Sequence, residues 1–100
     1  MELSQPSAVA GEGLERELAP FFSGGRLVVM PRRRAARLAV LDVLASFFEP
    51  GARYPERAVN DVLSNFNADF CTLRRYLVDE GFLDREDGVY WRSGGTVDVG

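Results

Sequence analysis

The sequence predicts an α+β domain made of three main helices and a small antiparallel β-hairpin. Three segments carry apolar residues at helical spacing, short loops rich in Pro, Gly and Asn separate them, and two β-rich runs flank Asp87-Gly88 near the end. One hundred residues are enough for one domain with a single modest core. No apolar run approaches the roughly 20 residues that a membrane span requires, so a soluble protein without a membrane partner is expected.

The two ends of the chain are predicted to lie outside the folded domain. Residues 1–13 are rich in small and polar side chains and are expected to form a flexible N-terminal segment, and residues 93–100 a flexible tail. A single domain is therefore expected over residues 14–92. The N-terminus has no basic leader and no long apolar stretch, so a cytoplasmic location is expected by default.

The first half of the domain is predicted to contain a short strand and the central helix. The β-branched run "RLVVM", which Pro31 ends, predicts a strand near residues 27–30. A long helix is then expected over about 33–48. Its apolar side chains cover a broad arc and leave chiefly Asp42 and Ser46 on the opposite side, so this helix should lie at the centre of the core.

Two further helices follow the chain break at "EPGARYP". The first should cover about 56–65, with Pro55 in its first turn, where a missing N–H costs nothing. The second should cover about 69–80, with Asn67 as its N-cap and Gly81 as its stop. The short connection between them predicts a crossed pair of helices.

The chain then closes with the predicted hairpin. The stretch "FLDREDGVYWR" predicts strands near residues 82–85 and 89–92 around a tight turn at Asp87-Gly88. Alternation along the last strand sends one of its two aromatic side chains inward, and Trp91 is expected to be the one in the core. The rest of the predicted core comes from apolar residues of the three helices: Leu41, Leu44, Phe48, Val59, Leu63, Phe66, Phe70, Leu73 and Leu77.

The order of helix, short extended link, helix, tight turn, helix and hairpin is that of a winged helix-turn-helix domain. The stretch from Gly25 to Arg92 also resembles the bacterial family catalogued as domain of unknown function 2087, whose words "GRL…P", "YxExxVN", "D…LRRxLVDxGxLxR" and "YWR" occur here in order. The resemblance implies a winged-helix-like module, found alone or attached to bacterial transcriptional regulators. Pro55 departs from the Thr or Ser usual in the family, so a different start of the second helix is expected.

The third helix contains the first candidate site, because the N-terminal half of this helix meets base edges in the major groove in such folds. It offers Thr72, Arg74 and Arg75 as DNA-binding candidates, and Arg pairs well with guanine. A structural interpretation stays open, with Arg75 paired to Asp79 one turn later and Arg74 packed along the neighbouring helix. The acids around this helix and at the hairpin tip count against phosphate binding, which is built from net positive surface.

The second candidate site is the acid-free run at the start of the first long helix. Its candidates for binding phosphate or another anion are Arg32, Arg33, Arg34 and Arg37. Cations at a helix N-terminus oppose the helix dipole, so a bound phosphate or an acidic partner would explain the cluster. A solvated surface is the alternative, and the sequence does not tell whether these arginines share a side with the third helix.

Catalytic and metal chemistry are not expected. The chain has no histidine and one cysteine, Cys71, which excludes an internal disulfide, Cys or His metal clusters and His-based triads. Adjacent carboxylates such as Asp79-Glu80 lack the separation or burial that acid–base work needs. No cofactor is expected, and Cys71 is either incidental or, beside arginines, a redox-sensitive thiol.

Two functions therefore remain open. One is a DNA-binding, transcription-regulatory module that uses the third helix and the arginine run. The other is a protein-interaction module, for another chain or for itself, without nucleic-acid binding. Arginines on one continuous face would favour duplex DNA, and acids that interrupt them would favour a protein partner.

Overall fold

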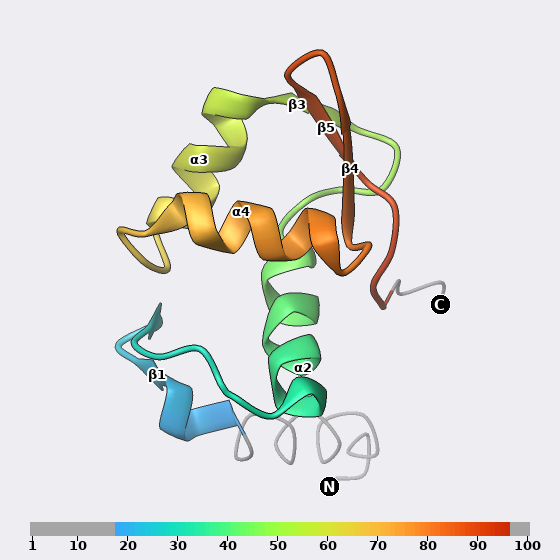
Figure 1. Ribbon diagram of the computed structural model, residues 1–100. Helices are drawn as coiled ribbons and strands as arrows, with labels where there is room; N and C mark the ends of the chain where they lie inside the picture. The colour runs from blue at the N-terminus through green and yellow to red at the C-terminus, as the bar shows by residue number, and fades with distance from the viewer. Residues whose placement is uncertain (1–17, 97–100) are drawn as a thin grey trace, which may run out of the picture.

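The computed structural model describes residues 18–96 and confirms the predicted α+β fold. Three α-helices within these residues follow the winged helix-turn-helix order of elements, with a strand between the first two and a hairpin after the third. The elements in chain order are η1 (Ala19–Phe21), β1 (Phe22–Ser23), β2 (Arg26–Leu27), α2 (Arg34–Ala45), β3 (Arg53–Pro55), α3 (Glu56–Ser64), α4 (Phe70–Asp79), β4 (Leu83–Glu86) and β5 (Val89–Arg92) (Figure 1).

The β1–β2 pair is shorter than the strand predicted near residues 27–30. Its turn is Gly24-Gly25, whose φ angles of 58° and 81° are in the left-handed region that favours glycine. Antiparallel pairing ends at Leu27, although the Val28 N–H still donates to the carbonyl of Phe21, the last residue of the 3-10 turn η1 (2.8 Å). Val28 and Val29 consequently lie outside the strand, and their side chains are 57% and 53% exposed.

Helix α2 ends at Ala45, three residues earlier than the sequence predicts. The next residues continue as a tighter turn, in which the N–H of Phe47 donates to Leu44 (3.2 Å) and that of Phe48 to Ala45 (3.0 Å). Glu49 precedes a proline and is therefore disfavoured in the helical region, so this tighter turn ends before it. Phe48 is nevertheless fully buried, as predicted.

The start of α4 is fixed by Asp69, and the prediction of Asn67 as N-cap is wrong. The Asp69 Oδ1 atom accepts a hydrogen bond from the Thr72 N–H (3.4 Å). The side chain of Asn67 instead orders the loop, because its Oδ1 accepts from the Asp69 N–H (2.7 Å) and its Nδ2 donates to the Leu27 carbonyl (2.7 Å). Pro55 occupies the N-cap position of α3, just before the first turn in which the sequence predicts it, and it makes no side-chain cap.

The end of α4 confirms the predicted stop at Gly81. The φ of Gly81 is 83°, the Phe82 N–H donates to the Leu77 carbonyl (2.8 Å), and the Gly81 N–H donates to the Val78 carbonyl (3.1 Å). This pair of bonds is a Schellman motif, in which a residue after the helix satisfies the last free carbonyls. The motif turns the chain directly into β4 and thereby sets the hairpin against α4.

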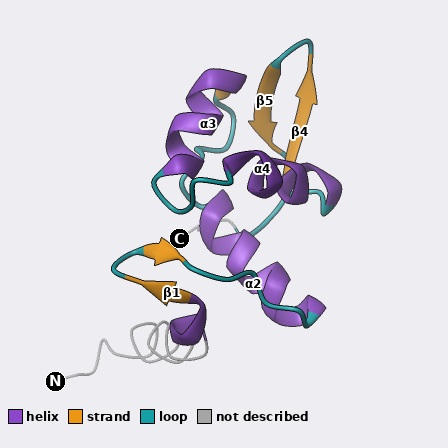
Figure 2. Ribbon diagram, turned by 60° about the vertical axis from the view of Figure 1, so that its left-hand side comes forward, coloured by secondary structure: helices purple, strands orange, loops and turns teal. Residues whose placement is uncertain are grey.

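A three-stranded antiparallel sheet has the order β3-β5-β4. The β4–β5 hairpin closes through Asp87 and Gly88, with φ angles of 54° and 78°, which confirms the predicted two-residue turn. Strand β3, predicted only as an extended link, pairs with β5 along Arg53 to Pro55. Figures 1 and 2 show α3 and the hairpin on one side of α4 and α2 on the other.

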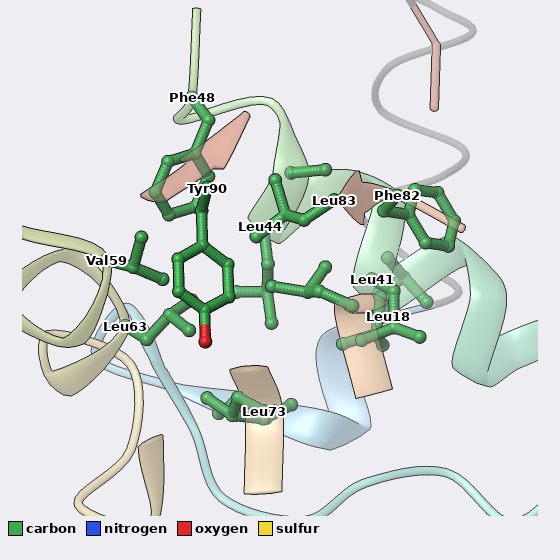
Figure 3. Packing of buried hydrophobic residues seen from close by; sticks show 14 residues of the cluster. Leu18, Leu41, Leu44, Phe48, Val59, Leu63, Leu73, Phe82, Leu83 and Tyr90 are labelled. Atoms are coloured by element: carbon green, nitrogen blue, oxygen red, sulfur yellow. The ribbon is translucent and has the colours of Figure 1, made fainter. Parts of the chain in front are cut away.

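The core lies where α2, α3 and α4 meet the sheet, and most of its predicted members are buried. Figure 3 shows the ring of Tyr90 among Phe48, Leu44 and Leu63. Two predicted core residues, Phe66 and Phe70, are only partly buried at its edge. The fully or nearly fully buried members of the predicted set are Leu41, Leu44, Phe48, Val59, Leu63, Leu73 and Leu77.

The prediction that Trp91 enters the core is wrong, because β5 alternates in the opposite phase. Tyr90 is fully buried, whereas Trp91 is half-buried on the other face of the sheet. There the guanidinium carbon of Arg53 lies 4.6 Å from the centre of the Trp91 ring. The core therefore contains a phenol, whose hydroxyl needs a hydrogen-bond partner.

The predicted flexible segments fall mainly outside the described residues, namely all of 1–13 and the last four residues of 93–100. The described part of the tail returns to the domain, since the Ser93 N–H donates to Phe82 (3.0 Å) and the Thr96 N–H donates to Asp42 Oδ1 (2.7 Å). Within residues 18–96, no helix is long and apolar enough to cross a membrane.

Candidate nucleic-acid interface

The outward face of α4 brings together two of the three predicted base-reading residues. Leu73 and Leu77 form the buried stripe of the helix, so residues at the complementary helical positions face solvent. Thr72 and Arg75 are both exposed there and line one shallow depression of about 260 Å³ together with Tyr76 and Asp79. This side of α4 can therefore present a hydroxyl and a guanidinium group to a ligand.

Arg74, the third predicted base-reading residue, is turned toward α3. Its Nη1 atom donates to Oδ1 of Asn60, and its Nη2 atom lies 3.9 Å from Oε2 of Glu56. The side chain is only 18% exposed. Arg74 thus packs along the neighbouring helix, as the structural interpretation predicts, and its contacts join α3 to α4.

Arg75 does not make the predicted ion pair with Asp79. Among residues 18–96, the pairs with a nitrogen–oxygen distance within 4.0 Å are Arg34–Glu80 and Arg74–Glu56. Arg75 and Asp79 line the same depression without such a contact. The Arg75 side chain is therefore held by neither of the two ion pairs of the described part.

The arginine run at the start of α2 lies against the C-terminal half of α4, which answers a question that the sequence leaves open. The Nη2 atom of Arg34 lies 2.8 Å from Oε1 of Glu80. The guanidinium carbon of Arg37 lies 5.7 Å from the centre of the Tyr76 ring, and its Nη1 donates to the Arg32 carbonyl (2.9 Å). The two predicted candidate sites therefore adjoin each other.

Arg32 and Arg33 are exposed at the other edge of this run. They line a hollow of about 510 Å³ whose remaining wall is apolar: Leu18, Phe21, Pro31, Ala35, Ala36 and Ala39. Arg33 occupies the N-cap position of α2 but makes no side-chain cap. The guanidinium groups of both residues thus extend the basic surface away from α4.

Arg85 is a further basic residue of this region that the sequence analysis missed. A hollow of about 170 Å³ between α4 and the hairpin is lined by Arg85 and by Cys71, Arg74, Arg75, Val78, Asp79 and Tyr90. Arg85 lies next to the acidic residues of the hairpin tip, Glu86 and Asp87. The alternation of strand residues could have found it, because Arg85 is two residues after the buried Leu83 and therefore shares the face of β4 that meets α4.

A chain of polar contacts positions Arg85 over this hollow. Its Nη1 atom donates to the hydroxyl of Tyr90 (3.4 Å), and that hydroxyl donates to Oε1 of Glu56 (2.9 Å). The hydrogen bond with Tyr90 raises the pKa of Arg85 above its ordinary value. Glu56 also faces Arg74, and one carboxylate therefore links the hairpin to α4.

Acidic side chains interrupt the basic surface at several points. Asp79 lines both the hollow and the shallow depression, and Glu80 neutralises Arg34. Glu86 and Asp87 are exposed at the hairpin tip. Residues 18–96 contain eleven arginines and ten acidic residues, so the described part has a net charge close to zero.

Comparison with known proteins gives one match. The model of the family described as "Uncharacterized protein conserved in bacteria (DUF2087)" matches residues 26–92. No curated protein and no solved structure matches the chain. The matched interval begins at β2 and ends with β5, so it includes α4, the arginine run and the hollow beside the hairpin.

Proposed function

The chain belongs to the family of uncharacterized bacterial proteins DUF2087, and we propose that it is a weak duplex-DNA-binding module of a transcriptional regulator. The role is binding rather than catalysis. In this proposal α4 approaches the major groove, Thr72 and Arg75 face the base edges, and arginines on both sides of α4 contact phosphates.

One observation carries the proposal: guanidinium groups follow one another across the outward side of α4. Arg85 and Arg75 line the hollow next to the hairpin. Arg75 and Tyr76 line the adjoining depression, and Arg37 lies over the Tyr76 ring. An exposed helix flanked by cations on both sides is the arrangement that a groove between two phosphate backbones requires.

The contact set differs from the one that the sequence alone suggests. Arg74 is assigned a structural role, because its guanidinium group is engaged by Asn60 and Glu56. Arg34 contributes little positive charge, because Glu80 lies 2.8 Å from it. The proposed phosphate contacts are therefore made by Arg32, Arg33, Arg37 and Arg85.

The acids within this surface set the expected strength of binding. Asp79 stands beside Arg75, and the hairpin tip is acidic, so phosphates are repelled at both places. We expect affinities in the range of ordinary non-specific binders, about 10⁻⁴ to 10⁻⁶ M. With about four phosphates neutralised, the logarithm of the affinity should fall with the logarithm of the salt concentration at a slope of about −3 to −4.

Fluorescence anisotropy with labelled random duplexes at about 50 mM salt tests the proposal. The double charge reversal Arg32→Glu/Arg33→Glu should weaken binding to all sequences alike, whereas Arg57→Ala, on the exposed side of α3, should leave it unchanged. Absence of any anisotropy change at tens of micromolar protein, a range that non-specific binders reach, would refute duplex binding.

A protein-interaction module is the second candidate. The acidic residues that interrupt the basic surface favour it, and so do exposed apolar side chains elsewhere. Val28, Val29 and Phe47 are 57%, 53% and 56% exposed, and exposed apolar side chains of this size are candidates for contact with another protein. In this case the apolar residues would meet another chain or a second copy of this one. Sedimentation velocity of the full chain, compared with a Val28→Ser/Val29→Ser variant, distinguishes self-association from a monomer.

A further inference from the structure

We propose that the hollow between α4 and the β4–β5 hairpin binds a phosphoryl oxyanion, with Arg75 and Arg85 as its clamp. The inference rests on the proposed function only for one possible source of that group, a backbone phosphate of duplex DNA, which Arg75 would hold together with Arg85 from its place beside the base edges. Free inorganic phosphate presents the same chemistry and supplies the probe.

The hollow is lined by arginines from two separate elements. Arg74 and Arg75 come from α4, and Arg85 comes from β4. Its volume of about 170 Å³ is below the roughly 300 Å³ at which small-molecule pockets begin, so it suits one small group with accompanying water. Guanidinium groups match the geometry of phosphate oxygens with pairs of parallel N–H donors.

The fold holds Arg85 in place for this role. The residue is paired with Tyr90 across the β4–β5 ladder, and Tyr90 is fully buried. The hydrogen bond to the Tyr90 hydroxyl (3.4 Å) involves only Nη1 of the guanidinium group. A guanidinium group carries five N–H donors, so this single bond leaves most of its donors for an anion.

The carboxylates near the hollow do not cancel its positive charge. Glu56 accepts the hydrogen bond of the Tyr90 hydroxyl and lies 3.9 Å from Nη2 of Arg74, so both of its oxygens already face a partner. Asp79 lines the hollow itself, yet within residues 18–96 no nitrogen–oxygen distance of 4.0 Å or less joins it to an arginine. Three guanidinium groups therefore stand against two carboxylates, and Asp79 should weaken anion binding without abolishing it.

The first test is a titration of the full chain with inorganic phosphate at constant ionic strength, followed by amide chemical shifts. Saturable shifts are expected at Cys71, Arg75 and Arg85. Arg85→Gln should weaken binding about tenfold or more, because a charge-assisted hydrogen bond is lost, and Asp79→Asn should tighten it. The control Arg57→Gln, on exposed α3 surface away from the hollow, should bind as the parent does.

Cys71 provides a second readout, because this exposed thiol lines the hollow and is the one cysteine of the chain. Saturating phosphate should slow its alkylation by iodoacetate in the parent and not in Arg85→Gln. Should Arg85→Gln fail to fold, as judged by circular dichroism, Arg75→Gln provides the same test from α4. Shifts that do not saturate, or that persist unchanged in these variants, would overturn the inference.

Duplex titrations separate the two sources of the phosphoryl group. If a backbone phosphate occupies the hollow, Arg85→Gln should reduce the salt-dependence slope of duplex binding by about 1. Saturable phosphate binding without duplex binding would support the phosphate site in the hollow and refute the proposed function. The opposite result is duplex binding without saturable phosphate binding, with the salt-dependence slope unchanged in Arg85→Gln. It would refute the phosphate site in the hollow and leave the proposed function unaffected.

Discussion

Replacement of Arg74 by Ala should destabilise the domain, whereas the same replacement of its neighbour Arg75 should not. Arg74 is 18% exposed and donates from Nη1 to Asn60 Oδ1, while its ion pair with Glu56 is long, at 3.9 Å, to a side chain that is 46% exposed. Loss of a hydrogen bond from a charged donor costs about 1.5 to 3 kcal/mol. The exposed ion pair adds no more than about 0.5 kcal/mol.

The expected loss for Arg74→Ala is therefore about 1.5 to 3 kcal/mol in the free energy of unfolding. For a domain of this size each kilocalorie shifts the melting temperature by about 4 to 8 °C, so a decrease of at least about 6 °C is expected. Arg75→Ala, at an exposed site, should change the stability by less than about 0.5 kcal/mol.

Urea unfolding of the parent and of both variants measures these differences. A double-mutant cycle of Arg74→Ala with Asn60→Ala should give a coupling energy above about 0.5 kcal/mol. The structural role of Arg74 would be refuted if Arg74→Ala were as stable as the parent, or if the coupling energy were zero. In that case Arg74 would return to the set of residues available for a ligand.

Three further substitutions test the packing and hydrogen bonds that position α4 and the hairpin, and thermal and urea unfolding measure each of them. Leu73→Ala, at a side chain that is 4% exposed, should cost about 2 to 5 kcal/mol, and a variant as stable as the parent would remove α4 from the core. Gly81→Ala should cost about 1 to 2 kcal/mol through the φ of 83° alone, since an added Cβ meets no atom within 4 Å; no loss would mean that α4 ends in another way. Tyr90→Phe should cost about 0.5 to 1.5 kcal/mol by removing the 2.9 Å bond to Glu56, and an unchanged stability would contradict that bond.

Local signals in the sequence were sufficient for the helices and the tight turns. Gly81 and Asp87-Gly88 are recognisable because a left-handed backbone or a two-residue hairpin restricts the residue types that fit. Long-range pairing has no such local signal. Strand β3 exists because Arg53 to Pro55 meet β5, more than thirty residues later in the chain. Which face of β5 is buried likewise depends on the face of the sheet that packs on the helices, so that Tyr90 and not Trp91 enters the core.

The candidate site shows the same division between local and long-range information. Helical spacing places Thr72 and Arg75 on one face of α4, opposite Leu73 and Leu77. The contacts of the Arg74 side chain depend on how α3 crosses α4, because its guanidinium group donates a hydrogen bond to Asn60 on α3. Strand alternation places Arg85 on the same face of β4 as Leu83, but its position beside Arg75 depends on how the hairpin packs against α4.

The central claim is that the outward side of α4 is the surface that binds duplex DNA. Amide chemical-shift mapping of the isotope-labelled full chain during titration with a short duplex, at about 50 mM salt, tests it most directly. The expected result is a set of salt-sensitive shifts at Thr72, Arg75, Arg85 and the residues around Arg32 to Arg37. Shifts confined to the surface of Val28, Val29 and Phe47, or no shifts at all, would contradict the claim.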